Sequence, residues 1–379
     1  MIDALAADRA RIVNLNAQIQ DLECSLRSLS ALQSERALVQ ERLDSYKYPV
    51  LTLPEEIVCE IFIHFLPVYP SSPPLTGPHS PILLTHICGE WRRIALAFPA
   101  LWRAIEISSD NPSWLLPSVV LGRSGFCPLS IRVDDLYREL GNLGSVLAAI
   151  LLHRARWEYL SLRLIRDRSD YPDIGGPMPL LRHLDLEFES DTDVHVPSFA
   201  EAPLLRTAIL NDSASRGIIL PWAQLTSLTL KIMYLYECVP FLQQAANLTH
   251  CELEILHDFN ETSVADIVLP SLQSLTLNDP HPVVHRVDHL QSFFVPALCS
   301  LEISECFLGR DPIDSLASFI AKSGCKLQRV DIVDRYAVSR HSYRTKFPAI
   351  RVFSMEEKIR IRTQIRDGQR SDSLDDEVS

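Results

Sequence analysis

The sequence lacks a hydrophobic segment long enough to cross a membrane. Its longest apolar runs, such as residues 146–152, are about a third of the roughly 20 residues that a spanning helix needs. The first residues, MIDALAADRARIV, include acidic side chains and no apolar stretch, so we expect no secretory signal peptide. The chain is therefore expected to fold in water and to have no membrane contact.

The nine cysteines form no CxxC pair, since the two closest are Cys299 and Cys306. This spacing disfavours a zinc ribbon or a dithiol redox centre. Reduced thiols in the protein core are the expected state, which suggests a cytoplasmic and/or nuclear protein.

The sequence also lacks excess basic charge. It contains 36 Lys and Arg residues against 48 Asp and Glu residues, a formal net charge of −12. A nucleic-acid-binding protein needs a basic face, so nucleic acid is not an expected partner. A hydrophobic content of 47% is that of an ordinary folded protein.

No catalytic motif is present. The sequence has neither a GxxxxGK[ST] phosphate loop nor a GxGxxG fingerprint. His281, His285 and His289 recur every four residues, but Pro280 and Pro282 disfavour the helix that would stack them. We therefore expect no catalytic residues, no metal and no cofactor, and we look for function on surfaces that bind other proteins.

Residues 1–45 form the first segment, a predicted long helix over 5–43. Apolar residues repeat with the 3-4 spacing of a coiled coil up to Leu29, after which the phase slips and Arg36 falls on the seam. Two interpretations remain open: a short coiled coil that makes a homodimer, or an amphipathic helix that lies on the chain's own domain.

Residues 46–102 are predicted to be a small helical module. Pro54 and two glutamates open a helix in which Ile57 and Ile61 lie on one face and Val58 and Phe62 on the next. A short helix that is apolar on two sides needs a partner for one of them. A proline-rich loop follows over 67–81, then two further helices at 82–87 and 88–96 and a closing Leu-Trp at 101–102.

The order Leu-Pro-Glu-Glu-Ile, apolar helix, Cys-x-x-Trp-Arg and Leu-Trp resembles the F-box, especially the form expanded in mushroom-forming fungi with a proline-rich insert. The resemblance covers about 50 residues and extends more weakly to residues 114–133. It implies binding to a Skp-family adaptor and, through it, to a cullin. The expected adaptor-binding residues are Leu53, Pro54, Ile57, Ile61, Leu84 and Ile87.

Residues 103–353 contain a recurring Leu-x-x-Leu-x-Leu pattern. It starts at positions 157, 181, 205, 225, 248, 272, 298 and 327, with spacings of 20 to 29 residues. That period is typical of leucine-rich repeats, in which each unit adds one strand to a curved parallel sheet. An ordinary α/β domain with leucine-rich strands is the alternative. The repeats are irregular, because the usual Asn or Cys after the last leucine occurs only as Cys306.

Strand side chains alternate, so the residues between the leucines are expected on the concave face, where solenoids bind their ligands. We expect an unknown protein substrate there, and the acidic bias weakly favours a basic one. The candidate substrate-binding residues are Asp185, Glu187, Lys231, Glu252, Glu254, Asn278 and Glu302.

Residues 354–379 are predicted to form a C-terminal helix, which starts at a Ser354-x-x-Glu357 capping box, and a disordered tail. The expected fold is thus an α+β or α/β solenoid: an N-terminal helix, a small helical F-box and a curved leucine-rich-repeat-like parallel sheet. The predicted function is the non-catalytic substrate receptor of an SCF-type ubiquitin ligase. The alternative is a repeat scaffold outside ubiquitination that self-associates through its N-terminal helix.

Overall fold

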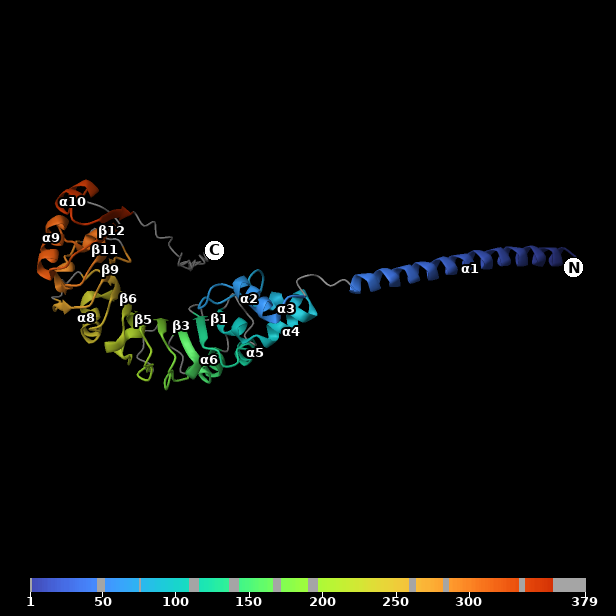
Figure 1. The fold of residues 1–379 in the computed structure, drawn as a ribbon, viewed down its shortest axis with the longest axis horizontal. Helices are drawn as coiled ribbons and strands as arrows, with labels where there is room; N and C mark the ends of the chain where they lie inside the picture. Colours follow the sequence, from blue (N-terminus) through green and yellow to red (C-terminus); the bar gives the residue numbers. More distant parts are fainter. Residues whose placement is uncertain are drawn as a thin grey trace, which may run out of the picture.

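The computed structural model describes residues 2–45, 52–74, 76–108, 116–135, 143–165, 172–189, 197–258, 264–281, 286–333 and 338–356. Figure 1 shows a long helix at the N-terminal end, a small group of helices, and then an arc of strands with helices along its outer side. The chain is thus an α/β protein with one large parallel sheet.

The first helix, α1, spans Ile2–Ser45, as the sequence predicts. Every side chain of α1 that the structure describes is exposed to solvent, including the seam residues Ile12, Leu15 and Leu22. In Figure 1 the helix extends away from the arc. The described part of the structure therefore does not support the interpretation in which this helix lies on the chain's own domain.

Residues 52–102 form the helical module. It contains α2 (Glu55–Phe65), α3 (Pro81–Ile87), α4 (Gly89–Ala97) and the 3-10 helix η2 (Pro99–Trp102). Ser80 and Cys88 cap α3 and α4, because their side chains accept hydrogen bonds from the backbone N–H groups of Ile82 and Trp91. The Trp102 indole donates to the carbonyl of Ala95 and ties η2 to α4.

In the described part of the chain, eleven strands form one parallel sheet, in the order β1-β2-β3-β4-β5-β6-β7-β9-β11-β12-β13. The eight predicted repeats all supply strands. These are β3 (Trp157–Ile165), β4 (His183–Glu189), β5 (Thr207–Asn211), β6 (Ser227–Tyr234), β7 (His250–Leu256), β9 (Ser274–Asn278), β11 (Ser300–Ser304) and β12 (Arg329–Val333). Three strands of this sheet were not predicted: β1 (Ala104–Ser108), β2 (Leu129–Asp135) and β13 (Val352–Glu356).

Helices and short turns connect the strands. They are α5 (Leu116–Arg123), α6 (Leu143–Leu151), η3 (Arg154–Arg156), α7 (Asp212–Ser215), η4 (Trp222–Gln224), α8 (Leu235–Gln244), η5 (Leu290–Ser292), η6 (Glu305–Phe307), α9 (Pro312–Ser323) and α10 (Arg340–Lys346). A two-stranded parallel pair, β8 (Ile267–Val268) with β10 (Phe293–Phe294), lies apart from the main sheet. Figure 1 shows α5, α6, α8 and α9 on the outer side of the arc.

The core fills the space between the sheet and these outer connections. Leucines at alternate strand positions, such as Leu184 and Leu186 of β4 and Leu228 and Leu230 of β6, are almost completely buried. The residues between them face the inner side of the arc. The period of two that places apolar residues in the core therefore also sets which side chains line the concave face.

The prediction that a helix begins at Ser354 is wrong. Ser354 lies in β13, where it is paired with Asp331 of β12 and its hydroxyl donates to the Asp331 carboxylate. The edge of β12 offers a full row of backbone partners, and this pairing outweighs the local capping signal. The remainder of the predicted helix and tail lies outside the described residues. No helix in the described part of the chain is long and apolar enough to cross a membrane.

Candidate functional site

The exposed face of α2 is the first candidate surface. Leu53, Ile57 and Ile61 are 38%, 48% and 40% exposed, whereas Val58 and Phe62 on the neighbouring face are buried. Phe62 packs edge-on against Trp91 of α4, with ring centroids 5.0 Å apart. The module therefore buries one side of α2 and leaves the other side in solvent. Pro54, which precedes the helix, is exposed as well.

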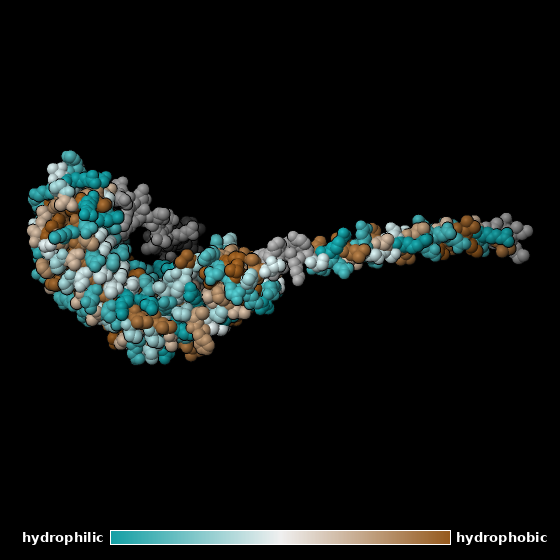
Figure 2. Space-filling model, viewed as in Figure 1, coloured by the Kyte–Doolittle hydropathy of each residue, from teal (hydrophilic) through white to brown (hydrophobic). Residues whose placement is uncertain are grey.

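In α3, one of the two predicted adaptor-binding residues is wrong. Leu84 is only 2% exposed and belongs to the core, so it cannot contact a partner, whereas Ile87 is 55% exposed as expected. The residue that takes the exposed position is Leu83, at 41%. Figure 2 shows hydrophobic side chains gathered over the helical module near α2. We define the exposed apolar set Leu53, Pro54, Ile57, Ile61, Leu83 and Ile87 as the module face.

The proline-rich loop joins the helical module to the sheet. The Tyr69 ring lies edge-on to Tyr159 of β3, with centroids 5.5 Å apart, and the guanidinium of Arg103 lies 3.9 Å from the centre of the Tyr69 ring. Ser130 of β2 donates to the carbonyl of Pro70. Burial and the hydrogen bond to Glu158 both raise the pKa of the Tyr69 phenol. The insert therefore packs on the first strands.

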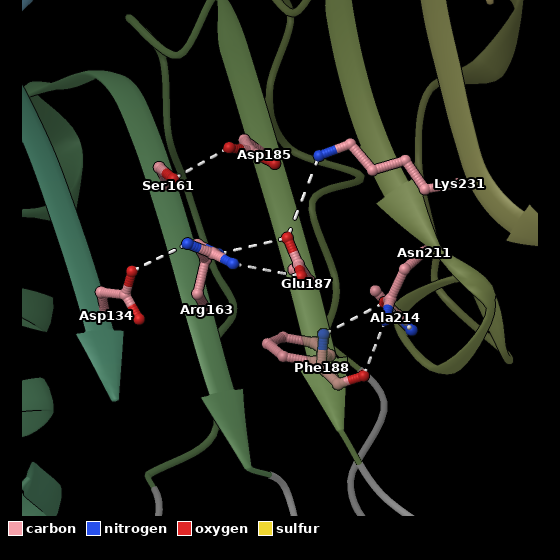
Figure 3. A network of polar contacts seen from close by, with 9 residues as sticks. All are labelled: Asp134, Ser161, Arg163, Asp185, Glu187, Phe188, Asn211, Ala214 and Lys231. Carbon is pink, nitrogen blue, oxygen red and sulfur yellow. Dashed lines mark hydrogen bonds and ion pairs between the residues drawn. The ribbon is translucent and has the colours of Figure 1, made fainter. Parts of the chain in front are cut away.

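The concave face is the second candidate surface, and its clearest feature is a charge network across β2, β3 and β4 (Figure 3). Arg163 donates to Asp134 at 2.9 Å and to both carboxylate oxygens of Glu187, at 3.2 and 3.3 Å. Lys231 of β6 lies 3.9 Å from Glu187. Burial alone would lower the pKa of Arg163, but the carboxylates of Glu187 and Asp134 raise it.

Asp185 lies beside this network on β4. Its Oδ2 accepts a 3.0 Å hydrogen bond from the Ser161 hydroxyl. A cavity of about 350 Å³ opens here, between the loop residues 70–72 and the concave side chains of β2, β3 and β4. The structure thus brings three predicted residues, Asp185, Glu187 and Lys231, into one neighbourhood.

The remaining candidates lie further along the sheet. Glu252 is exposed and Glu254 and Glu302 are half-buried, each between buried strand neighbours, which agrees with the predicted alternation. The prediction that Asn278 lies exposed on the concave face is wrong, because this residue is only 3% exposed. It is the last residue of β9, and the chain then turns into Asp279, whose N–H donates to the Ser304 hydroxyl. The end of the strand is therefore covered.

Asn211, a residue that we did not predict, ties two repeats together. Its amide donates to the carbonyl of Phe188 and its Oδ1 accepts from the N–H groups of Phe188 and Ala214 (Figure 3). Asn211 thereby caps α7 and bonds to the end of β4 at the same time. It directly follows Leu210, the last leucine of its repeat.

One cluster could hold a metal. The ligand atoms of His257, Asp279 and Cys306 lie within 4.8 Å of one another, each just beyond the end of a strand. His, Asp and Cys are ligands that zinc uses. Both oxygens of Asp279 are already engaged, Oδ1 by the N–H of His281 and Oδ2 by His257 at 2.9 Å and Cys306 at 3.7 Å. These bonds tie the ends of three strands together.

The structure describes two of the three histidines that recur every four residues. His281 is exposed and His289 is buried, and His285 lies outside the described residues. In comparisons with known proteins, no protein-family model matches the chain, and neither does any curated protein.

Proposed function

We propose that the protein is a non-catalytic substrate receptor of an SCF-type ubiquitin ligase. In this proposal residues 46–102 are an F-box that binds a Skp-family adaptor, and the sheet is an irregular leucine-rich-repeat array whose concave face captures a protein substrate. The observation that carries the proposal is the exposed half of α2. Leu53, Ile57 and Ile61 remain in solvent on a helix whose other side, Val58 and Phe62, is buried.

An exposed apolar stripe of this kind is stabilised when a partner covers it. Burial of one such side chain contributes about 1–2 kcal/mol to binding, from about 25 cal/mol for each Å² removed from water. The sequence order of the F-box supports a Skp-family adaptor as that partner. The parallel array supports the second half of the proposal, because curved repeat arrays offer extended concave surfaces to protein ligands.

The test is adaptor pull-down by a double variant, Leu53→Ala with Ile57→Ala, in the full chain. The loss of about 2–4 kcal/mol would weaken adaptor binding by roughly thirty- to a thousandfold. The matched control is Ile219→Ala with Val268→Ala, which truncates two apolar residues of similar exposure on the sheet region. Circular dichroism checks that both variants fold. A folded double variant that retains adaptor like the wild type refutes the F-box assignment.

The second candidate function is a repeat scaffold outside ubiquitination that self-associates through α1. The specific observation in its favour is that the apolar seam residues of α1 are all exposed. Co-purification of a cullin with the adaptor separates the two functions, because a scaffold outside ubiquitination would bring neither. Self-association alone is compatible with both.

A further inference from the structure

His257, Asp279 and Cys306 meet at one edge of the sheet because they follow three neighbouring strands. His257 directly follows β7, Asp279 directly follows β9, and Cys306 lies in η6, directly after β11. These strands are parallel neighbours, so their carboxyl ends lie side by side. The ligand residues are 22 and 27 positions apart in the sequence, which is the period of the repeats and not the spacing of a metal-binding motif. A metal was therefore not expected from the sequence.

The three side chains converge on one point. Asp279 Oδ2 accepts from His257 Nε2 at 2.9 Å and from Cys306 Sγ at 3.7 Å, and all three atoms lie within 4.8 Å of one another. Zinc bonds of about 2.0 Å to nitrogen and oxygen and about 2.3 Å to sulfur separate tetrahedral ligand atoms by about 3.3–3.5 Å. The observed N–O and O–S separations differ from these values by about half an ångström or less. A zinc ion that replaces the two hydrogen-bonding protons therefore requires only small side-chain shifts.

Contacts outside the cluster orient these side chains. The N–H of His281 donates to Asp279 Oδ1 at 2.8 Å, and this bond holds Oδ2 toward the other two ligand atoms. The His257 ring packs against Phe307, with ring centroids 5.4 Å apart, and Phe307 follows Cys306 in η6. Contacts of this kind fix metal ligands in position and strengthen metal binding.

We propose that His257, Asp279 and Cys306 bind a zinc ion that ties the ends of β7, β9 and β11 together. The Asp279 carboxylate and the Cys306 thiolate balance the two positive charges of the ion, so the buried site is neutral as a whole. On binding, Cys306 releases its thiol proton to solvent and His257 coordinates as a neutral imidazole. A thiolate and an imidazole favour zinc over Mg²⁺ and Ca²⁺, which prefer oxygen ligands.

Cys306 provides the access to the site. His257 and Asp279 are buried, whereas Cys306 is half-buried, so the ion enters on the side of the thiol. Zinc takes four ligands, and a water on this side completes the three that the protein supplies. The inference goes beyond the proposed function and does not depend on it, because the ion would stabilise the array of strands whatever the array binds.

The first experiment locates the ion in the wild-type protein. The metal-free full chain is alkylated with iodoacetamide in the presence and absence of equimolar Zn²⁺, and mass spectrometry follows each cysteine. Zn²⁺ should slow the alkylation of Cys306 at least about tenfold, because the sulfur is then bound to the ion. Cys299, which is also half-buried, should react equally fast in both samples, and Mg²⁺ should protect neither cysteine. An unchanged rate at Cys306 overturns the proposal, even if zinc binds elsewhere on the chain.

The second experiment uses variants of the full chain, whose folding is checked by circular dichroism. Titration against a chelating dye should show that Cys306→Ser weakens Zn²⁺ binding at least about a hundredfold, whereas Cys299→Ser leaves it unchanged. Zn²⁺ should raise the melting temperature of the wild type and of Cys299→Ser, but not that of Cys306→Ser. Equal Zn²⁺ affinity of Cys306→Ser and the wild type overturns the proposal. If Cys306→Ser does not fold, the alkylation rates of the wild type decide the question.

Discussion

The hydroxyl of Tyr69 donates a 2.9 Å hydrogen bond to Glu158 Oε2, across 89 positions of sequence. Tyr69 belongs to the proline-rich loop and Glu158 to β3, so this bond fastens the helical module to the array of strands. Arg182 of the next repeat pairs with the other oxygen of the same carboxylate at 3.2 Å. The bond helps to fix the module face relative to the concave face, as the proposed function requires.

We predict that Tyr69 and Glu158 are energetically coupled. Tyr69→Phe removes the donor and Glu158→Gln removes the charge, and a hydrogen bond to a charged group contributes about 1.5–3 kcal/mol. Urea unfolding of both single variants and of the double variant should give a coupling energy of at least about 1 kcal/mol. Tyr236→Phe is the control, because Tyr236 is an exposed tyrosine. Strictly additive losses for Tyr69 and Glu158 would contradict the prediction.

A second prediction concerns α1. Isoleucine at one seam position with leucine at the other favours two-stranded parallel coils, and these residues are exposed in the single chain. We expect the full chain to dimerise at tens of micromolar, an order of magnitude suited to so short a coil. Leu15→Glu with Leu22→Glu should give a monomer by sedimentation velocity. Ala10→Glu with Ala17→Glu, on the opposite side of the helix, should remain dimeric.

A wild-type chain that sediments as a monomer at this concentration would show that α1 is not a dimerisation element. The same experiment on a chain that begins at Tyr46 separates α1 from any other contact between copies. Dimerisation that persists after this truncation would assign the interface elsewhere.

The third prediction tests the strand register at β7. Glu252 is exposed and Leu253 is completely buried. Glu252→Lys, alone or with Glu254→Lys and Glu302→Lys, should change the free energy of unfolding by only about 0.5 kcal/mol per site. Leu253→Ala should cost about 2–5 kcal/mol, because it leaves a cavity in the core. Thermal and urea unfolding measure both, and a large loss for Glu252→Lys would mean that the register is off by one residue.

The fourth prediction is a pH dependence of stability from His289. Burial first, and then the nearby His257, lower the pKa of His289 from 6.5 to about 4, while Asp258 opposes them. Between pH 6.5 and 4 the unfolded chain therefore binds a proton that the folded chain does not, so this contribution to stability is complete above pH 6.5 and is lost as the pH falls. A difference of this size corresponds to about 3–3.5 kcal/mol.

His289→Phe removes this titration and keeps an aromatic ring beside Phe307, whose centroid lies 5.1 Å from that of His289. Urea unfolding at pH 7, 6, 5 and 4 should show a shallower decline for this variant than for the wild type. His86→Gln, at an exposed position, should decline like the wild type. Parallel curves for His289→Phe and the wild type would exclude His289 as the source.

The leucine pattern was sufficient to predict eight strands of the sheet and their buried faces, because apolar side chains at every second position of a strand lie on the same face and pack into the core. It missed β1 and β2 because their apolar residues, such as Ile105 and Ile131, alternate without the Leu-x-x-Leu spacing. β13 was missed because Ser354 begins a capping-box sequence, which predicts a helix. Such a local pattern does not show that the edge of β12 is free to pair with another strand.

The errors at the sites have similar causes. In the seven-residue helix α3, Leu83 and Leu84 are adjacent and equally apolar, so only the packing on α4 decides that Leu84 is buried. Asn278 was expected in solvent because alternation assumes that a strand continues. The Asp185 cavity could not be predicted, since one of its walls is the loop 70–72, which precedes Asp185 by more than 110 residues in the sequence.

The regular spacing of the parallel strands limits how a ligand can be recognised. Neighbouring strands lie about 4.8 Å apart. An extended peptide places side chains on the same face every 6.6–6.8 Å. The two spacings coincide only after about 34 Å, which is roughly seven strand spacings. Across eleven strands, an extended segment that crosses them can be in phase at about two places. In the proposed function, such a face would select a ligand by the interval between two of its contact residues and would leave the residues between them free to vary.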